Sequence, residues 1–300
     1  MKKYFFFITI LFSVNFYVFS AVENISIADG LIFTPNTTIN LEPLDEGLNL
    51  DDFLISESPS IKLERSDENR LSLGLMMNIK RKAYLGEESN FETLPIIEAK
   101  YDNFFIKPST LDTISGYIGG YNFYSDRQFV LSGIVEYHLA EQDSKRLDSP
   151  YNQFIKSKDS EFYFGLSGKY IPEASPELSM GIDIGKNFLN SGALRIKAYG
   201  ERYIPYTQDL YLITAFSYVF LDKDYCNYYY SVPRTKWTDS YEDFSGGKFG
   251  AHLDLVYSLG DNINFRSINS VEIFSNEISQ SPIIANKINL NVGLGLMFTF

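Results

Sequence analysis

The amino-acid sequence predicts an all-β protein, a transmembrane antiparallel up-and-down β-barrel of about 12 strands with both termini periplasmic. Three observations predict it. Apolar residues stand at every second position of the last segment, "INLNVGLGLMFTF", and the residues between them are polar or small except Met297. The same alternation recurs in segments of about ten residues, the length of a membrane-spanning strand. Aromatic residues make up 16% of the chain, and many stand at segment ends, as in the aromatic girdles of such barrels.

Residues 1–20 are predicted to be a signal peptide for export. Lys2 and Lys3 provide a positive start, an apolar run follows, and Val18 and Ser20 fit the small-residue positions before a cleavage site. An uncleaved membrane anchor is the alternative, but the run is short for a bilayer span. We therefore expect an exported protein.

The rest of the chain divides by composition into two parts. Residues 21–69 are acidic, contain many turn residues and alternate poorly, so we expect a mostly irregular periplasmic segment. Residues 70–300 carry the barrel pattern. Cys226 is the single cysteine, which excludes a disulfide framework within one chain. The net charge of −12 argues against nucleic acid as a partner, because nucleic acid needs a basic face.

Each predicted strand sets apolar residues on one face and small or polar residues on the other. In "LSLGLMMNI", Leu71 and Leu73 share the apolar face while Ser72 lies on the opposite one. "EFYFGLSGKY", "LSMGIDIG" and "ALRIKAYGERY" alternate in the same way. The predicted strands span residues 71–79, 93–101, 103–107, 112–123, 128–139, 160–171, 177–186, 193–203, 210–220, 248–259, 263–274 and 287–300. The segment "DYCNYYY" at 224–230 could extend the strand before it.

A soluble β-sandwich is the alternative architecture. Its strands are usually shorter, at roughly five or six residues. The non-apolar face in this chain mixes Gly, Ser and Asn with charges of both signs, which suits a confined, wet lumen better than open solvent. The barrel is therefore the preferred interpretation.

The lengths of the connections predict the side on which each one lies. The long linkers all follow odd-numbered strands and so share one side; they are 80–92, 140–159, 221–247 and 275–286. Even-numbered connections, such as "GDN" at 260–262, are tight. Because short turns are typical of the periplasmic side, both termini are predicted to face the periplasm.

The polar face of the strands predicts the lining of the lumen. The predicted lumen-facing residues are Glu136, His138, Lys169, Asp183, Arg195, Lys197, Glu201, His252 and Asp254, with Glu161 and Arg266 inward or near strand ends. Charges of both signs favour ion pairs across a narrow or plugged barrel over a wide porin. Leu131→Arg is expected to impair assembly because Leu131 meets lipid, whereas Glu136→Gln is expected not to.

The two histidines raise the question of catalysis. His138 stands two residues from Glu136, and Ser132 lies on the same predicted face, as a lipid hydrolase would require. A polar lumen produces such adjacencies by chance, and neither a nucleophile elbow nor metal-ligand spacing accompanies them. We therefore predict no catalytic residue, no metal site, no cofactor and no enzymatic activity.

Several different short motifs follow one another along residues 70–300. "AYLGEESNFETLPIIEAKYDNFFI" carries a Tyr–x–Gly element, an acidic loop, Leu–Pro and an aromatic strand end. Its matching residues are Tyr84, Gly86, Glu87, Glu88, Leu94, Pro95, Tyr101, Asn103, Phe104 and Phe105. "GGYNF" (119–123), "DSKRL" (143–147), "FLDKDYCNYYYSV" (220–232) and "SPII" (281–284) follow. In this order the motifs resemble the MltA-interacting protein family, MipA/OmpV.

This resemblance implies a location in the bacterial outer membrane and a set of partners. The family includes scaffolds for murein enzymes, so the implied partners are a lytic transglycosylase and a penicillin-binding murein synthase. Outer-membrane lipid would surround the apolar face. Phe298 and Phe300 end the last strand with aromatic residues and form the expected signal for the barrel-assembly machinery.

Three functions are compatible with the sequence. The leading prediction is a structural or scaffolding protein for murein-remodelling enzymes in a Gram-negative cell envelope. The first alternative is a narrow channel for small polar solutes, and the second is an outer-membrane lipid hydrolase.

Overall fold

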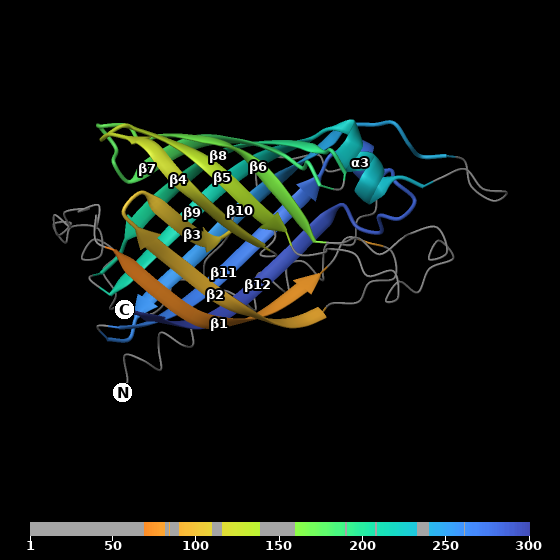
Figure 1. Cartoon of the computed structure of the whole chain (residues 1–300). Coiled ribbons are helices and arrows are strands. Elements are labelled where there is room, and N and C mark those ends of the chain that lie inside the picture. The colour runs from red at the N-terminus through yellow and green to blue at the C-terminus, as the bar shows by residue number, and fades with distance from the viewer. Residues whose placement is uncertain are drawn as a thin grey trace, which may run out of the picture. The chain divides into compact units, whose positions relative to one another are not determined.

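The chain forms a closed antiparallel β-barrel of twelve strands in the computed structural model. The structure describes residues 69–81, 84, 90–109, 116–138, 160–189, 191–207, 209–232, 240–260 and 262–300. The predicted signal peptide and the acidic segment up to residue 68 lie outside the described residues, as do the motif residues 86–88 and 143–147. Figure 1 shows the strands running side by side around the barrel. The predicted antiparallel β-barrel of about 12 strands is confirmed.

The strands follow one another around the barrel in chain order. They are β1 (Arg70–Arg81), β2 (Asn90–Tyr101), β3 (Phe104–Pro108), β4 (Gly116–Ser125), β5 (Phe129–His138), β6 (Glu161–Tyr170), β7 (Leu178–Lys186), β8 (Leu194–Pro205), β9 (Leu210–Leu221), β10 (Gly246–Ser258), β11 (Ile263–Phe274) and β12 (Ile288–Thr299). Helix α3 (Lys223–Tyr230) follows β9, and helix α4 (Asn276–Ser279) follows β11. Among the described residues, no helix is long and apolar enough to cross a membrane.

The alternating segment at the C-terminus is the strand that closes the barrel. β12 pairs with β1 from Ser72 opposite Thr299 to Arg81 opposite Leu290, and it pairs with β11 on its other side. Closure matters because lipid offers no hydrogen bonds to an unpaired strand edge.

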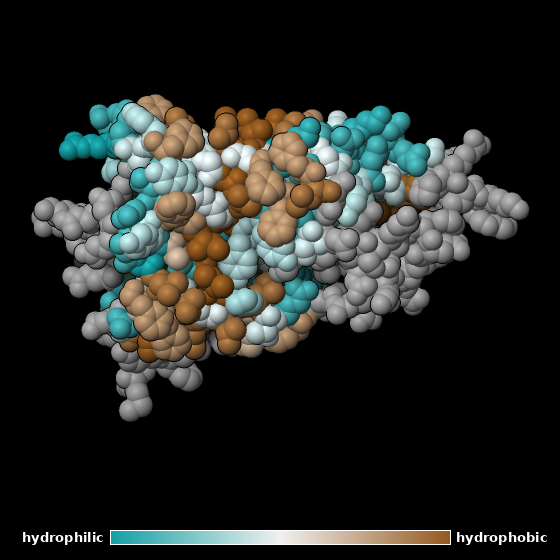
Figure 2. Space-filling model, in the orientation of Figure 1, coloured by the Kyte–Doolittle hydropathy of each residue, from teal (hydrophilic) through white to brown (hydrophobic). Residues whose placement is uncertain are grey.

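The outward faces of the strands are apolar. On β1, Leu75 is 63% exposed, whereas the inward-facing neighbours Met76 and Asn78 are buried. Figure 2 shows hydrophobic residues across the wall of the barrel and hydrophilic residues gathered toward its ends. Exposed aromatic rings pair between neighbouring strands near both ends, with centroid distances of 4.9 Å for Phe129 and Tyr170 and 4.7 Å for Tyr218 and Phe249. An apolar band between aromatic girdles is what a lipid bilayer requires of a barrel wall.

We expect Leu75→Arg to destabilise the folded barrel in a bilayer by about 2–4 kcal/mol, because Leu75 lies near the middle of β1. Leu131 lies near the start of β5, where an arginine side chain reaches the membrane–water interface. Leu131→Arg is therefore expected to lower the free energy of unfolding by less. Guanidinium unfolding in phospholipid vesicles measures both. Equal losses for the two variants would contradict this assignment of depth.

β3 is short, and its ends differ from the predicted 103–107. It pairs with β2 only from Ala99 to Tyr101, and Ser109 then donates its N–H to the Gly116 carbonyl at the start of β4. Pro95 lies in β2 outside the residues that pair with β3 in the described structure. Proline has no N–H, and at this position that loss removes no hydrogen bond to β3. β4 runs further than predicted, to Ser125, and carries a β-bulge opposite β5.

Candidate functional site

The inner faces of the strands carry all of the predicted lumen-facing residues. The structure places Glu136, His138, Lys169, Asp183, Arg195, Lys197, Glu201, His252 and Asp254 there, together with Glu161 and Arg266. Nearly all of them contact side chains from other strands, so the lumen is crossed by polar interactions.

Five of these residues form one buried charge cluster, which consists of Glu136, His138, Asp183, Arg195 and Lys197. The Glu136 carboxylate accepts from Arg195 Nη1 at 3.0 Å and from Lys197 Nζ at 3.1 Å. Lys197 Nζ also lies 2.9 Å from the Asp183 carboxylate, and His138 lies beside Glu136 at 3.4 Å. Because β5 and β8 are not neighbours in the barrel, this cluster connects strands across the lumen.

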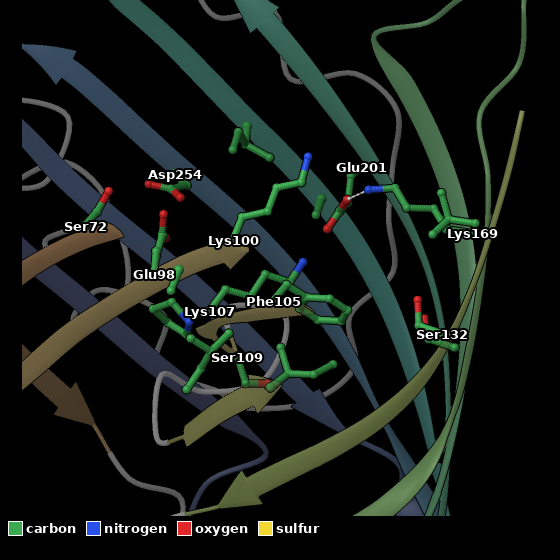
Figure 3. Close-up of a pocket in the computed structure, with 18 of the residues that line it drawn as sticks. Ser72, Glu98, Lys100, Phe105, Lys107, Ser109, Ser132, Lys169, Glu201 and Asp254 are labelled. Atoms are coloured by element: carbon green, nitrogen blue, oxygen red, sulfur yellow. Dashed lines mark hydrogen bonds and ion pairs between the residues drawn. The ribbon is translucent and has the colours of Figure 1, made fainter. Parts of the chain in front are cut away.

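Three further ion pairs lie on the same inner surface. Lys169 donates to Glu201 at 2.9 Å, as the dashed line in Figure 3 shows. Arg266 donates from Nε to both oxygens of Asp254 at 2.9 Å and from Nη1 to Glu98. Burying a charge is costly unless it is paired or hydrogen-bonded.

The residues proposed for hydrolysis are not brought together. Ser132 donates to Asn122 at 2.6 Å, and it stands six residues from His138 along β5, which is about 20 Å. His138 instead contacts Arg195 and Glu136. A serine cannot be activated by a base at that separation, since activation needs direct hydrogen bonding.

One end of the lumen is filled by a hydrophobic cluster rich in tyrosine, called the tyrosine cluster below. Its buried members are Tyr84, Tyr163, Ala193, Val219, Leu221, Tyr225, Cys226, Tyr229, Tyr230, Val232, Phe274, Ile278 and Ile283. Helices α3 and α4 contribute to it, and both lie at the end of the barrel away from the C-terminus (Figure 1). The cluster closes the described part of this end with packed side chains.

A buried carboxylate attaches α3 to the wall. Glu161, at the start of β6, is fully buried and accepts hydrogen bonds from Tyr229 at 2.6 Å and Tyr163 at 2.7 Å. Asn187 and Ser191 donate to its other oxygen at 2.7 and 2.8 Å. These four donors compensate for the loss of water around the carboxylate.

Sequence reasoning missed α3, because residues 224–230 were read as a possible strand extension. The run of tyrosines favours a strand by propensity. Asp222 overrides it, since its side chain accepts from the Tyr225 N–H at 2.9 Å as a helix N-cap. The helix could have been identified from Asp222 at the N-cap followed by a second acidic residue, Asp224, in the first turn.

The single cysteine lies within the tyrosine cluster. Cys226 is fully buried on α3 and contacts the Leu221 carbonyl. Burial raises the pKa of its thiol to about 12. The folded protein therefore holds this residue as an unreactive thiol.

The other part of the lumen holds a cavity of about 740 Å³, shown in Figure 3. Its lining reaches Arg70 and Thr299, near the first and last residues of the barrel. Its lining includes residues predicted to face the lumen, such as Lys169, Glu201 and Asp254. It also includes Glu98, Lys100 and Lys107, which the sequence pattern did not identify. Alternation along β3 could have identified Lys107, which lies two residues from the inward-facing Phe105.

The comparison with protein families gives one clear result. The family model described as MltA-interacting protein MipA matches residues 73–300, which is nearly the whole described barrel. No curated protein matches the chain.

Several solved structures are similar to the chain at low identity. The NanC porin is 11% identical, with a TM-score of 0.45 over 75% of this chain and 98% of that one. The KdgM porin, solved with a disordered oligogalacturonate, is 9% identical, with a TM-score of 0.41 over 76% and 99%. OmpT of Vibrio cholerae is 9% identical, with a TM-score of 0.33 over 78% and 97%.

Proposed function

Because the chain belongs to the MltA-interacting protein MipA family, we propose that this outer-membrane β-barrel is a non-enzymatic scaffold for murein-remodelling enzymes. The partners that fit the proposal are a lytic transglycosylase, which the family description names as MltA, and a penicillin-binding murein synthase. Export through a signal peptide at residues 1–20 belongs to the same proposal.

The observation that carries the proposal is the obstruction of the lumen by the chain's own side chains. The tyrosine cluster fills one end, and the buried charge cluster connects β5 to β8 across the lumen. Transport would need a continuous water path, and side chains that occupy the lumen interrupt it. The ends and loops of the barrel are then the surfaces that other proteins can bind.

Binding of a purified lytic transglycosylase of the MltA type tests this function. The full-length protein, immobilised in detergent or nanodiscs, is expected to retain the transglycosylase above the level retained by an unrelated outer-membrane porin. The murein synthase is then added to detect a ternary complex. Retention no greater than that of the control porin would contradict the scaffold.

A narrow channel for small polar solutes is the second candidate, which the cavity of about 740 Å³ favours. Planar-bilayer recordings separate the two functions. The scaffold proposal predicts a closed barrel with no steady current, whereas regular ohmic steps would favour the channel.

A further inference from the structure

The cavity has a charge opposite to that of the whole chain. Among the described residues, the basic side chains that line it are Arg70, Lys100, Lys107, Lys169, Lys197 and Arg266. Four acidic side chains line it, namely Glu98, Asp183, Glu201 and Asp254. This excess of cations stands inside a chain with a net charge of −12. An enclosed surface with one excess sign concentrates ligands of the other sign.

Lys107 is the cation whose charge is left for a ligand. Lys169 is paired with Glu201 and Arg266 with Asp254, whereas Lys107 has no hydrogen bond or ion pair among the described residues. It projects from β3 beside Phe105 into the cavity, as Figure 3 shows. Its nearby charges include Lys169 as well as Glu201, so the acidic groups on that wall are shared between several cations.

His252 provides a second, independent indication of a ligand. Its side chain lines the same cavity from β10 and is only 8% exposed. Neither ring nitrogen has a hydrogen-bond partner among the described residues. A buried imidazole without partners is costly. Both nitrogens are covered by neighbouring atoms, so the ring must turn toward the cavity to offer its one donor and one acceptor to a bound molecule.

The remaining lining suits a hydroxylated molecule. Ser72, Ser132 and Ser167 contribute hydroxyl groups, and Tyr199 and Phe105 contribute rings. A cavity of about 740 Å³ has the size of small-molecule sites, which enclose roughly 300–1,000 Å³.

We propose that this cavity binds a small, soluble, hydroxylated anion, such as a sugar that carries a carboxylate or phosphate group. Lys107 holds the anionic group, and the turned ring of His252 binds one hydroxyl of the ligand. Ser132 and Ser167, whose hydroxyls donate to Asn122 and Asp183, accept from other hydroxyls of the ligand. The site does not depend on the scaffold function, because it uses only the interior of the barrel.

Calorimetric titration of the full-length protein in detergent micelles at low salt tests the site. Glucose 6-phosphate and glucuronate are the anionic probes, and glucose is the neutral probe of the same ring size. We expect saturable binding of at least one anionic probe and at least tenfold weaker binding of glucose. Raising the salt concentration should weaken the anionic binding further.

Variants locate the site within the lumen. Lys107→Gln is expected to weaken anion binding at least fivefold, Lys107→Arg to retain it, and His252→Gln to weaken it with an unchanged salt dependence. Lys186→Gln, at an exposed lysine at the end of β7 outside the cavity, is the matched control and should bind as the unchanged protein does. Folding of each variant is checked by its heat-modifiable band on gels.

Three results would overturn the proposal. They are equal affinity for glucose and the anionic probes, unchanged affinity in folded Lys107→Gln, and no detectable binding of either anionic probe. A failure of the scaffold assay leaves these measurements unaffected, so the two proposals are separable.

Discussion

Glu136→Gln is expected to lower the free energy of unfolding by roughly 3–5 kcal/mol, the usual cost of breaking a buried ion pair from one side. The substitution removes the carboxylate between Arg195 and Lys197, which are both nearly inaccessible to water. Two cations then face each other without full compensation. The sequence alone predicted tolerance because Glu136 faces the polar lumen and not lipid; the structure revises that expectation.

Guanidinium unfolding of the refolded protein, followed by circular dichroism, measures this loss. Glu173→Gln is the control, because Glu173 is exposed in the turn between β6 and β7. Adding Lys197→Gln to Glu136→Gln restores the charge balance, so the double variant should lose less than the sum of the two single losses. Additive losses, or a Glu136→Gln barrel as stable as the control, would refute the role assigned to the cluster.

Glu161→Ala is expected to release α3 and open the plugged end of the barrel. The substitution leaves the hydroxyls of Tyr163 and Tyr229 and the side chains of Asn187 and Ser191 without their acceptor. Each unsatisfied buried group costs about 1–3 kcal/mol, so α3, whose buried face packs in the tyrosine cluster, should loosen before the barrel strands separate. Planar-bilayer recordings of the variant are expected to show current that the unchanged protein lacks.

Cys226 reports on the same opening, and no cysteine has to be introduced for the measurement. In the folded protein its burial and raised pKa should make alkylation by iodoacetamide at pH 8 very slow. In Glu161→Ala the rate is expected to rise about tenfold or more, which corresponds to about 1.4 kcal/mol of easier local opening. Tyr229→Phe removes one of the four donors and should show a smaller increase. Glu277→Ala, at an exposed carboxylate on α4, is the control. If Cys226 were alkylated as fast in Glu277→Ala as in Glu161→Ala, Glu161 would not be the residue that holds α3.

The strands and their facing were predictable because each depends on local alternation. Successive side chains of a strand point to opposite faces of the sheet, so Leu75 faces lipid and its neighbour Met76 faces the interior. The closing pair of β12 with β1 followed from the same reasoning, since an open edge in lipid is too costly.

The candidate site was predictable only in part. Alternation placed Glu136 and Lys197 inside, but it could not say that they touch, because 61 positions separate them and two other strands lie between. The helix α3 was hidden behind a run of tyrosines with strand propensity, although its Asp222 cap was visible.

The sequence by itself determined that this protein is a lipid-facing barrel, which strands compose it and which polar residues enter its lumen. These features follow from one physical constraint, the contact of every second residue with hydrocarbon or with the lumen. Only the tertiary structure decided which charges pair across the lumen, that α3 and its tyrosines plug one end, and that Lys107 and His252 share a cavity. Those outcomes depend on the curvature and register of the closed sheet, which bring together residues that no local pattern connects.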